Sequence, residues 1–227
     1  MDYVFPPPPV PSLAIRGSEQ RFAVRRIFCV GRNYAEHAKE MGADTREPPF
    51  FFAKPADALV ADGAVLPWPM ATSDLHHEAE LVVAIGGAGR DLTPESAGAL
   101  VWGHAPGIDL TRRDMQAEAK QMRRPWDMSK GFDQSAPCGA LVPVSETGPL
   151  TSARILCTVN GQIRQDADIA DMIWDVPHII SHLSGLVELA PGDLIFTGTP
   201  AGVGPVLPGE TCRVEIAGLG AVGVRIG

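Results

Sequence analysis

The sequence predicts a mainly β fold with short helices, of the α+β class, on three observations. Glycine and proline supply 24 and 21 of the 227 residues, and such a turn-rich composition favours many short strands over a helical bundle. Short apolar or alternating runs recur along the chain and are separated by turn residues. Hydrophobic residues make up 45% of the chain and charged residues 20%, as in ordinary globular domains. We therefore expect a core large enough to need no disulfides.

The first half of the chain is expected to alternate strands with short helices. Residues 1–20 are predicted to form a proline-rich tail, because Pro6 to Pro9 favour polyproline II, and the folded domain would span 21–227. Asn33 and Thr93 stand where helix N-caps are expected. The predicted elements are a strand over 21–31, a helix over 33–41, strands over 50–54 and 76–86, and a helix over 94–100.

The second half is expected to hold a hairpin and one packed helix. Thr111 and Asp114 resemble a capping pair, and Asn160-Gly161 between two alternating runs predicts a hairpin. Residues 123–137 form a long irregular segment of the kind that is often functional. The predicted elements are a strand over 104–110, a helix over 111–122, the hairpin over 154–167, a helix over 174–189, a strand over 194–200 and two strands within 209–227. The helix over 174–189 is expected to pack through one apolar face, formed by Val176, Ile179, Ile180, Leu183, Leu186 and Val187.

Charge and cysteine content narrow the classes of partner. The chain has 19 basic and 27 acidic residues, a net charge of −8, which argues against nucleic acid. It has no basic region followed by an apolar region at its amino terminus and no apolar stretch of about eighteen residues, so we expect no membrane partner. Its four cysteines form no C-x-x-C pair, which fits a reducing compartment. These features predict a cytoplasmic protein.

Three acidic residues form a candidate metal site. Glu78 and Glu80 would project from the same face of one strand, roughly 7 Å apart at the backbone, where two inward-facing carboxylates need a cation. Asp109 lies in an apolar setting at the end of another predicted strand. An all-oxygen site of this kind selects Mg²⁺ or Mn²⁺ rather than Zn²⁺. The alternatives are two solvent-facing glutamates and an aspartate that only caps a turn.

Other polar residues could supply acid–base chemistry. His37 and Glu40 have the i, i+3 spacing that places them on one helix face, as a general base with its orienting carboxylate, although a simple surface contact is also possible. Lys130 and Lys54 belong to a set of only four lysines and lie in irregular or apolar segments. Either lysine could compensate a carboxylate site and stabilise an oxyanion, or could be an exposed loop residue.

Several common nucleotide and hydrolase motifs are absent from the sequence. There is no G-x-G-x-x-G fingerprint, no phosphate-binding P-loop and no G-x-S-x-G nucleophile elbow. A hydrolase built on this chain would therefore activate water directly. The glycine-rich stretch from Thr197 to Gly204 could bring backbone close to a ligand, although a plain turn explains it almost as well.

Taken in order, seven segments resemble the fumarylacetoacetate hydrolase family. They are VGRNYAEHAKEM, FFFAKPADALV, LHHEAELVVAIG, GIDLTRRDMQ, PWDMSKGFD, VNGQIRQDA and LIFTGTPAGVGP. The similarity as a whole covers almost everything from Arg26 to Pro208. The resemblance implies a mixed β-sandwich roll assembled as a homodimer, in the short form without the N-terminal domain of longer members. It implies a Mg²⁺ or Mn²⁺ site at Glu78, Glu80 and Asp109. It implies that the catalytic residues are His37, Glu40 and Lys130, the first two on a mobile lid. The substrate contacts that it implies are Lys54, Arg113, Gln116 and Thr199.

Within the family the chain is most similar to the bacterial fumarylpyruvate hydrolases of gentisate degradation. The resemblance implies a small oxo-acid substrate, a 2,4-dioxo acid, cleaved to fumarate and pyruvate by water that His37 deprotonates, with Arg113 holding a substrate carboxylate. Oxaloacetate decarboxylation and isomerisation or decarboxylation of a 2-hydroxyhepta-2,4-diene-1,7-dioate are alternative activities. A non-catalytic keto-acid- or metal-binding protein is the alternative of another class.

Overall fold

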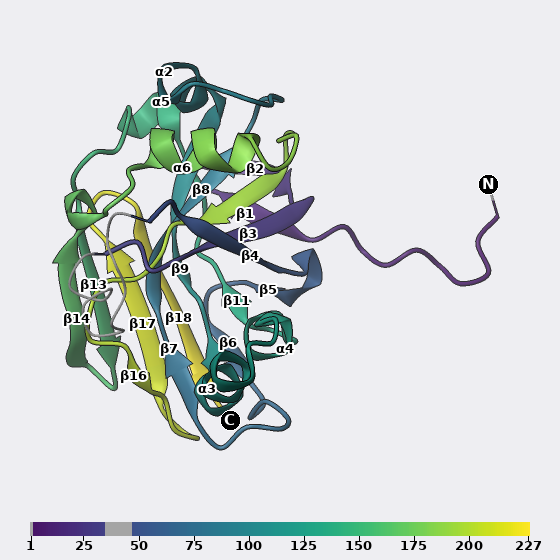
Figure 1. Ribbon diagram of the computed structural model, residues 1–227. Coiled ribbons are helices and arrows are strands. Elements are labelled where there is room, and N and C mark those ends of the chain that lie inside the picture. Colours follow the sequence, from purple (N-terminus) through teal and green to yellow (C-terminus); the bar gives the residue numbers. More distant parts are fainter. Residues whose placement is uncertain (1, 35–46) are drawn as a thin grey trace.

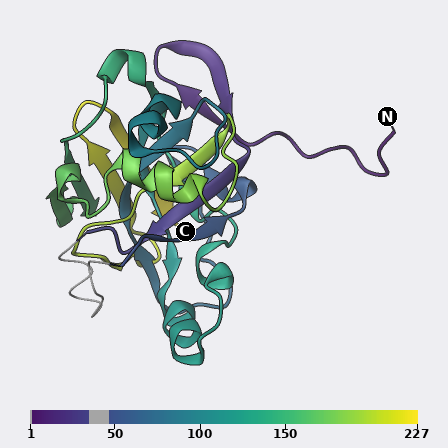
Figure 2. The ribbon, with the colours of Figure 1, turned by 45° about the horizontal axis from the view of Figure 1, so that its top comes forward.

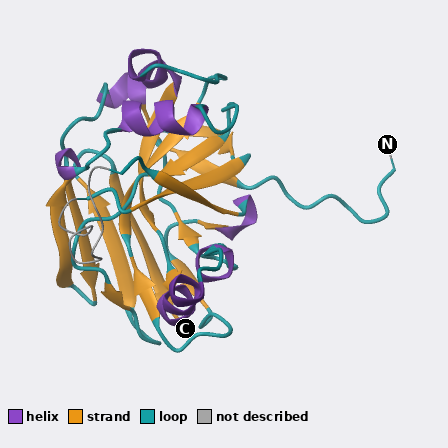
Figure 3. Ribbon diagram, viewed as in Figure 1, coloured by secondary structure: helices purple, strands orange, loops and turns teal. Residues whose placement is uncertain are grey.

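Strands predominate in the computed structural model, which describes residues 2–34 and 47–227 (Figure 1, Figure 3). The strands are β1 (Ser12–Ile15), β2 (Ser18–Ala23), β3 (Arg26–Gly31), β4 (Phe50–Lys54), β5 (Leu59–Val60), β6 (Ala64–Leu66), β7 (Leu75–His77), β8 (Ala79–Ile85), β9 (Val101–Ile108), β10 (Thr111–Arg112), β11 (Ala136–Pro137), β12 (Val142–Pro143), β13 (Arg154–Val159), β14 (Gln162–Asp168), β15 (Asp193–Phe196), β16 (Gly204–Pro205), β17 (Thr211–Ile216) and β18 (Gly220–Ile226). The helices are α2 (Pro94–Ala97), α3 (Arg113–Met122), α4 (Asp127–Lys130), α5 (Val144–Thr147) and α6 (Val176–Ser184), with 3₁₀ turns η1 (Ala56–Ala58), η2 (Gly98–Leu100) and η3 (Ile169–Asp171).

Two mixed sheets carry the core. The six-stranded sheet has the order β12-β9-β8-β15-β3-β4, and the five-stranded sheet has the order β14-β13-β17-β18-β6. β15 pairs with β3 in parallel, and β18 pairs with β6 in parallel, whereas the neighbours of β8 are antiparallel. The predicted mainly β fold, a mixed β-sandwich roll with short helices, is confirmed.

The central strand β8 is buried on both faces, which explains its unbroken apolar run. Leu81, Val83 and Ile85 belong to the larger core cluster, which includes residues of both sheets and of α6. Val82 and Ala84 point the other way, into a second cluster with residues of β3 and β15. Alternate residues of a strand face opposite sides, so each face of β8 packs against its own core.

Several predicted elements differ from those observed. The strand predicted over 21–31 is interrupted at residues 24–25, between β2 and β3, which belong to different sheets. The strand predicted over 76–86 is split at Glu78 into β7 and β8, which belong to different sheets. The helix predicted to reach residue 189 ends at Ser184, because Gly185 is a poor helix former, and Leu186 is 70% exposed rather than packed. Thr111 does not cap α3, since it lies in β10 and its hydroxyl accepts a hydrogen bond from Lys130.

The N-terminal segment is partly folded. Residues 2–10 extend away from the rest of the chain (Figure 1, Figure 2), and the Pro11 carbonyl already accepts a hydrogen bond from the Val24 amide. Residues 12–20, which the sequence analysis placed in the tail, belong to the β1–β2 hairpin, where Leu13 is buried. The helix predicted over 33–41 lies outside the described residues from 35 onward. In the part of the chain that is described, no helix is both long enough and apolar enough to cross a membrane.

Candidate metal centre and substrate pocket

Three buried carboxylates converge where β7, β8 and β9 meet. Glu78 stands at the break between β7 and β8, Glu80 is the second residue of β8, and Asp109 follows β9 directly. β8 and β9 pair through Ala79 and Ile108, which brings their ends together, and the Asp109 amide donates to the Glu78 carbonyl at 2.8 Å. One oxygen from each carboxylate lies within 4.8 Å of the other two, and all three residues are buried. The geometry therefore excludes the solvent-facing alternative for these residues.

Two lysines and one arginine balance part of this negative charge. Lys130 Nζ donates to Glu78 Oε2 at 2.7 Å and to Asp109 Oδ2 at 2.6 Å, and Lys54 Nζ lies 2.8 Å from Asp109 Oδ1. Arg113 Nη2 lies 2.5 Å from Glu78 Oε1. Burial opposes the charge on Lys130, but Asp109 and Glu78 outweigh it and raise the pKa of Lys130 above its usual range. Neither Lys54 nor Lys130 is an exposed loop residue, because both are 2% exposed.

Glu80 is the carboxylate without a cationic partner among the described residues. It is 1% exposed, and its Oε2 accepts one hydrogen bond, from the Gly198 amide at 2.8 Å. Burial first, and then the charges of Asp109 and Glu78, raise the pKa of Glu80 well above its ordinary value. A divalent cation held by the three carboxylates would compensate this charge. The donor set fits Mg²⁺ or Mn²⁺, because all three ligand groups are oxygen donors.

Gly198 has the conformation that this contact requires. Its φ of +96° lies in the left-handed region, and a Cβ at this position would meet the Cβ of Asn33 at 2.7 Å. Asn33 is itself fixed, since its side-chain amide donates to the carbonyls of Trp174 and Thr197 at 2.9 and 2.8 Å. The glycine-rich stretch predicted from the sequence therefore does bring backbone to the carboxylate site.

Three of the four predicted substrate contacts line one pocket beside the carboxylates. Arg113, Gln116 and Thr199 line it together with Glu78, Glu80 and Lys130. Lys54 does not line this pocket and instead pairs with Asp109. Arg113 is already engaged, because it also donates to Gln116 Oε1 at 2.6 Å. The roles of all four in substrate binding stay predictions.

Gln165 is a buried residue of the site that the sequence analysis did not identify. Its amide donates to Thr199 Oγ1 at 2.8 Å and its carbonyl oxygen accepts from the Ala79 amide at 3.0 Å. It thereby joins β14 to both β8 and the Thr199 turn. The alternation of the hairpin places Gln165 on the inward face of β14, but nothing local distinguishes it from an ordinary strand glutamine.

Arg32, Lys120 and Trp126 line the same pocket and were also missed. Nothing in their sequence context separates them from surface residues. The predicted dyad of His37 and Glu40 lies outside the described residues, so its role stays a prediction.

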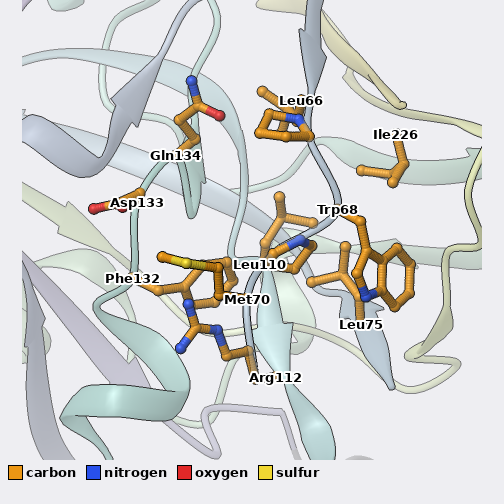
Figure 4. Close-up of a pocket in the computed structure, with 12 residues that line it drawn as sticks. Leu66, Trp68, Met70, Leu75, Leu110, Arg112, Phe132, Asp133, Gln134 and Ile226 are labelled. Atoms are coloured by element: carbon orange, nitrogen blue, oxygen red, sulfur yellow. The ribbon is translucent and has the colours of Figure 1, made fainter. Parts of the chain in front are cut away.

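A larger pocket, of about 250 Å³, lies elsewhere and holds none of the three carboxylates (Figure 4). Leu66, Trp68, Met70, Leu75 and Phe132 give it a mainly apolar lining, beside Arg112 and Asp133. Phe132 of this lining contacts two cations, because Lys54 Nζ lies 5.6 Å from its ring centroid and the Arg112 guanidinium 4.3 Å. The convergent charges, and not the larger volume, mark the candidate site.

Comparison with known proteins places the chain in a family. Residues 26–227 match the family described as Fumarylacetoacetate (FAA) hydrolase C-terminal. The chain belongs to the fumarylacetoacetate hydrolase family. The resemblance found in the sequence is thus confirmed, and the protein is an enzyme of that family.

Similar proteins within the family have different activities. The crystal structure of fumarylpyruvate hydrolase from Pseudomonas aeruginosa, in complex with Mn²⁺ and pyruvate, is 51% identical, with a TM-score of 0.97 over 99% of both chains. The mitochondrial oxaloacetate decarboxylase of Dictyostelium discoideum is 44% identical over 86% of this chain and 90% of its own length. The mitochondrial oxaloacetate tautomerase FAHD1 of Mus musculus is 39% identical over 86% of this chain and 88% of its own length.

Proposed function

We propose that the protein is a metal-dependent hydrolase that cleaves a carbon–carbon bond of a 2,4-dioxo acid, converting fumarylpyruvate to fumarate and pyruvate. The observation that carries this proposal is the similarity over 99% of the chain to a fumarylpyruvate hydrolase, at 51% identity, beside a buried triad of carboxylates. We further propose, from the family resemblance, that it acts in gentisate degradation, in the cytoplasm and as a homodimer.

The metal ligands would be Glu78, Glu80 and Asp109. A Mg²⁺ or Mn²⁺ ion held there would act as a Lewis acid toward the oxo-acid end of the substrate. Lys130 keeps two of these carboxylates in place, because its ammonium group donates to Glu78, Asp109 and Thr111 at once. Its positive charge also lies close enough to the pocket to stabilise negative charge that develops on the substrate.

Hydrolysis needs a base and a proton donor, and His37 fills both roles in this proposal. His37 removes a proton from water while the oxygen bonds to the distal carbonyl carbon, and Glu40 stabilises the imidazolium. The bond between that carbon and its neighbour then breaks, with its electron pair leaving on the pyruvate side. The imidazolium returns the proton to the pyruvate methylene carbon that received this electron pair, which gives pyruvate and fumarate. Thr199 can donate its hydroxyl proton to the substrate, because the hydroxyl oxygen already accepts from Gln165.

The test is turnover of fumarylpyruvate by the purified protein with Mn²⁺ or Mg²⁺. We expect loss of the enol absorbance with matching appearance of pyruvate and fumarate. The His37→Ala variant should lose hydrolysis and keep its metal affinity. If the wild-type protein does not cleave fumarylpyruvate with either metal, the proposal is wrong.

Oxaloacetate chemistry is the second candidate, and the 44% and 39% identities to oxaloacetate decarboxylase and tautomerase favour it. Decarboxylation requires no attacking water, so it would not depend on His37 as a base. Measuring kcat/KM for oxaloacetate and for a panel of acylpyruvates on one preparation separates the two candidates, since specificity is the ratio of these constants.

A further inference from the structure

The pocket beside the carboxylates is lined by more cationic side chains than acidic ones. Four cationic side chains line it, those of Arg32, Arg113, Lys120 and Lys130. Arg113 and Lys130 both form ion pairs with Glu78, at 2.5 and 2.7 Å. Within residues 2–34 and 47–227, neither Arg32 nor Lys120 forms an ion pair with a carboxylate.

Arg32 is held beside the pocket at a conformational cost. Its φ of 59° is in the left-handed region, which is strained for a residue other than glycine. Its Nε is buried and has no hydrogen-bond partner within residues 2–34 and 47–227, and its guanidinium lies 5.6 Å from the Phe50 ring centroid. A strained backbone and an unsatisfied donor at one residue suggest a ligand role.

Lys120 reaches the same pocket from α3. Arg113, Gln116 and Lys120 are spaced i, i+3 and i+7 along this helix, so one helix face supplies all three to the pocket. Lys120 Nζ lies 5.1 Å from the ring centroid of Trp126, which fixes the side chain over an aromatic face. Burial, and then the neighbouring charges of Arg113 and Arg32, lower the pKa of Lys120 to about 8. Repelling cations of this kind are stabilised when an anion binds between them.

We propose that Arg32 and Lys120 form an anion site that binds the distal carboxylate of the substrate, an inference that rests on the proposed function. One pocket is lined by the carboxylates that would hold the metal and by these two cations, so a single dicarboxylate can engage both. The pair thus determines specificity for acylpyruvates whose acyl group carries a second carboxylate.

The test compares two substrates that differ in the distal carboxylate, fumarylpyruvate and acetylpyruvate, on the Mn²⁺-loaded wild type and on Arg32→Gln and Lys120→Gln. A hydrogen bond to a charged group contributes roughly 1.5–3 kcal/mol, which corresponds to about 10- to 150-fold. We expect the ratio of kcat/KM for fumarylpyruvate to kcat/KM for acetylpyruvate to fall by about this factor in each variant. Lys120→Arg, which keeps the charge, should restore most of the ratio.

Arg124→Gln is the matched control, because Arg124 is a neighbouring cation that pairs with exposed Glu118 and does not line the pocket. Its ratio should equal that of the wild type. Equal losses on both substrates in Arg32→Gln and Lys120→Gln, or no loss on either, would overturn the inference while leaving the hydrolase function intact.

A binding measurement keeps the inference testable if the hydrolase proposal itself fails. Fumarate should raise the Tm of the Mn²⁺-loaded wild type more than crotonate, which has one carboxylate, and this difference should vanish in Lys120→Gln. If fumarate stabilises the wild type and Lys120→Gln equally, the anion site is not at these residues.

Discussion

Glu80 is the residue on which a bound cation should have the clearest effect. Its buried charge has no cationic partner among the described residues, and the folded protein holds its proton to a higher pH than the unfolded chain does. The metal-free protein should therefore lose stability as pH rises through the ordinary glutamate range, near 4.5, toward the raised folded pKa. The cost is complete only above the folded pKa.

Glu80→Gln should make the metal-free protein more stable and abolish its response to Mn²⁺. A ligand at a hundred times its Kd adds about 2.7 kcal/mol of stability, which is roughly 5–10 °C of Tm in a chain of this size. Thermal unfolding with and without Mn²⁺ measures both effects. Glu188→Gln, at an exposed glutamate, is the control and should respond like the wild type. A full Mn²⁺ shift in Glu80→Gln would show that Glu80 is not a ligand.

Lys130 should stabilise the metal-free site. Lys130→Met leaves Glu78 and Asp109 buried without this counter-charge, and removing one partner of a buried pair costs about 3–5 kcal/mol. Mn²⁺ should restore part of the loss, because it neutralises the same carboxylates. Urea unfolding with and without Mn²⁺ is the measurement. The electrostatic explanation fails if Lys130→Met is as stable as the wild type without metal.

Lys120 should give substrate selectivity a pH dependence. The charged groups around it are Arg113, Arg32, Glu78 and Lys130, and burial with the neighbouring cations brings its pKa to about 8. Lys120 is charged below this pH, so the fumarylpyruvate to acetylpyruvate ratio of kcat/KM should fall as pH rises through about 8. Lys120→Gln should show no such fall between pH 7 and 9. The same pH profile in wild type and variant would contradict this role.

For single residues, the sequence predicts a functional site where a charged side chain lies in an apolar segment that is expected to be buried. Glu80 and Asp109 are acidic residues within apolar strands, and that conflict is visible without a structure. Arg32 and Lys120 show no such conflict, because only the folded chain brings both to one pocket without an ion-pair partner among the described residues. Tertiary packing, not local pattern, creates the anion site.

At the scale of elements, the turn that carries Gly198 should control the geometry of the metal centre. Gly198→Ala places a Cβ 2.7 Å from the Asn33 Cβ and keeps the strained φ of +96°. We expect a loss of about 1–3 kcal/mol from strain alone, and weaker Mn²⁺ binding because the amide that contacts Glu80 must move. Urea unfolding and Mn²⁺ titration measure the two effects.

Gly220 offers a matched control for this turn. It has the same φ of +96°, but a Cβ there would meet no atom of the described residues within 4 Å. Gly220→Ala should lose the stability attributable to strain and keep its Mn²⁺ affinity. If both variants weaken Mn²⁺ binding equally, the Gly198 contact does not position Glu80.

The hairpin has a local signal in the sequence, whereas the break between β7 and β8 is set by packing. The sequence predicts the Asn160-Gly161 hairpin because Asn and Gly are the residues that a two-residue turn with positive φ favours. Both residues do adopt positive φ, of 50° and 78°. The break at Glu78 was missed because the sequence keeps its alternating pattern across it, while β7 and β8 join different sheets. This break is what places Glu78 next to Asp109.

At the scale of the whole molecule, the site depends on the sandwich that surrounds β8. Both faces of β8 are covered by apolar clusters, and Glu80 is buried between them. The turn-rich composition predicted this class of fold, but it could not indicate which strands become neighbours. Residues far apart in the chain, such as Glu80 and Gly198, meet only through the pairing of β8 with β15.

The most direct test of the metal centre is an anomalous difference map from crystals of the protein grown with Mn²⁺. We predict one strong peak per chain within coordination distance of Glu78, Glu80 and Asp109, and no peak in crystals of Asp109→Asn. A wild-type map with no peak between these carboxylates, or with the ion bound elsewhere, would contradict the account.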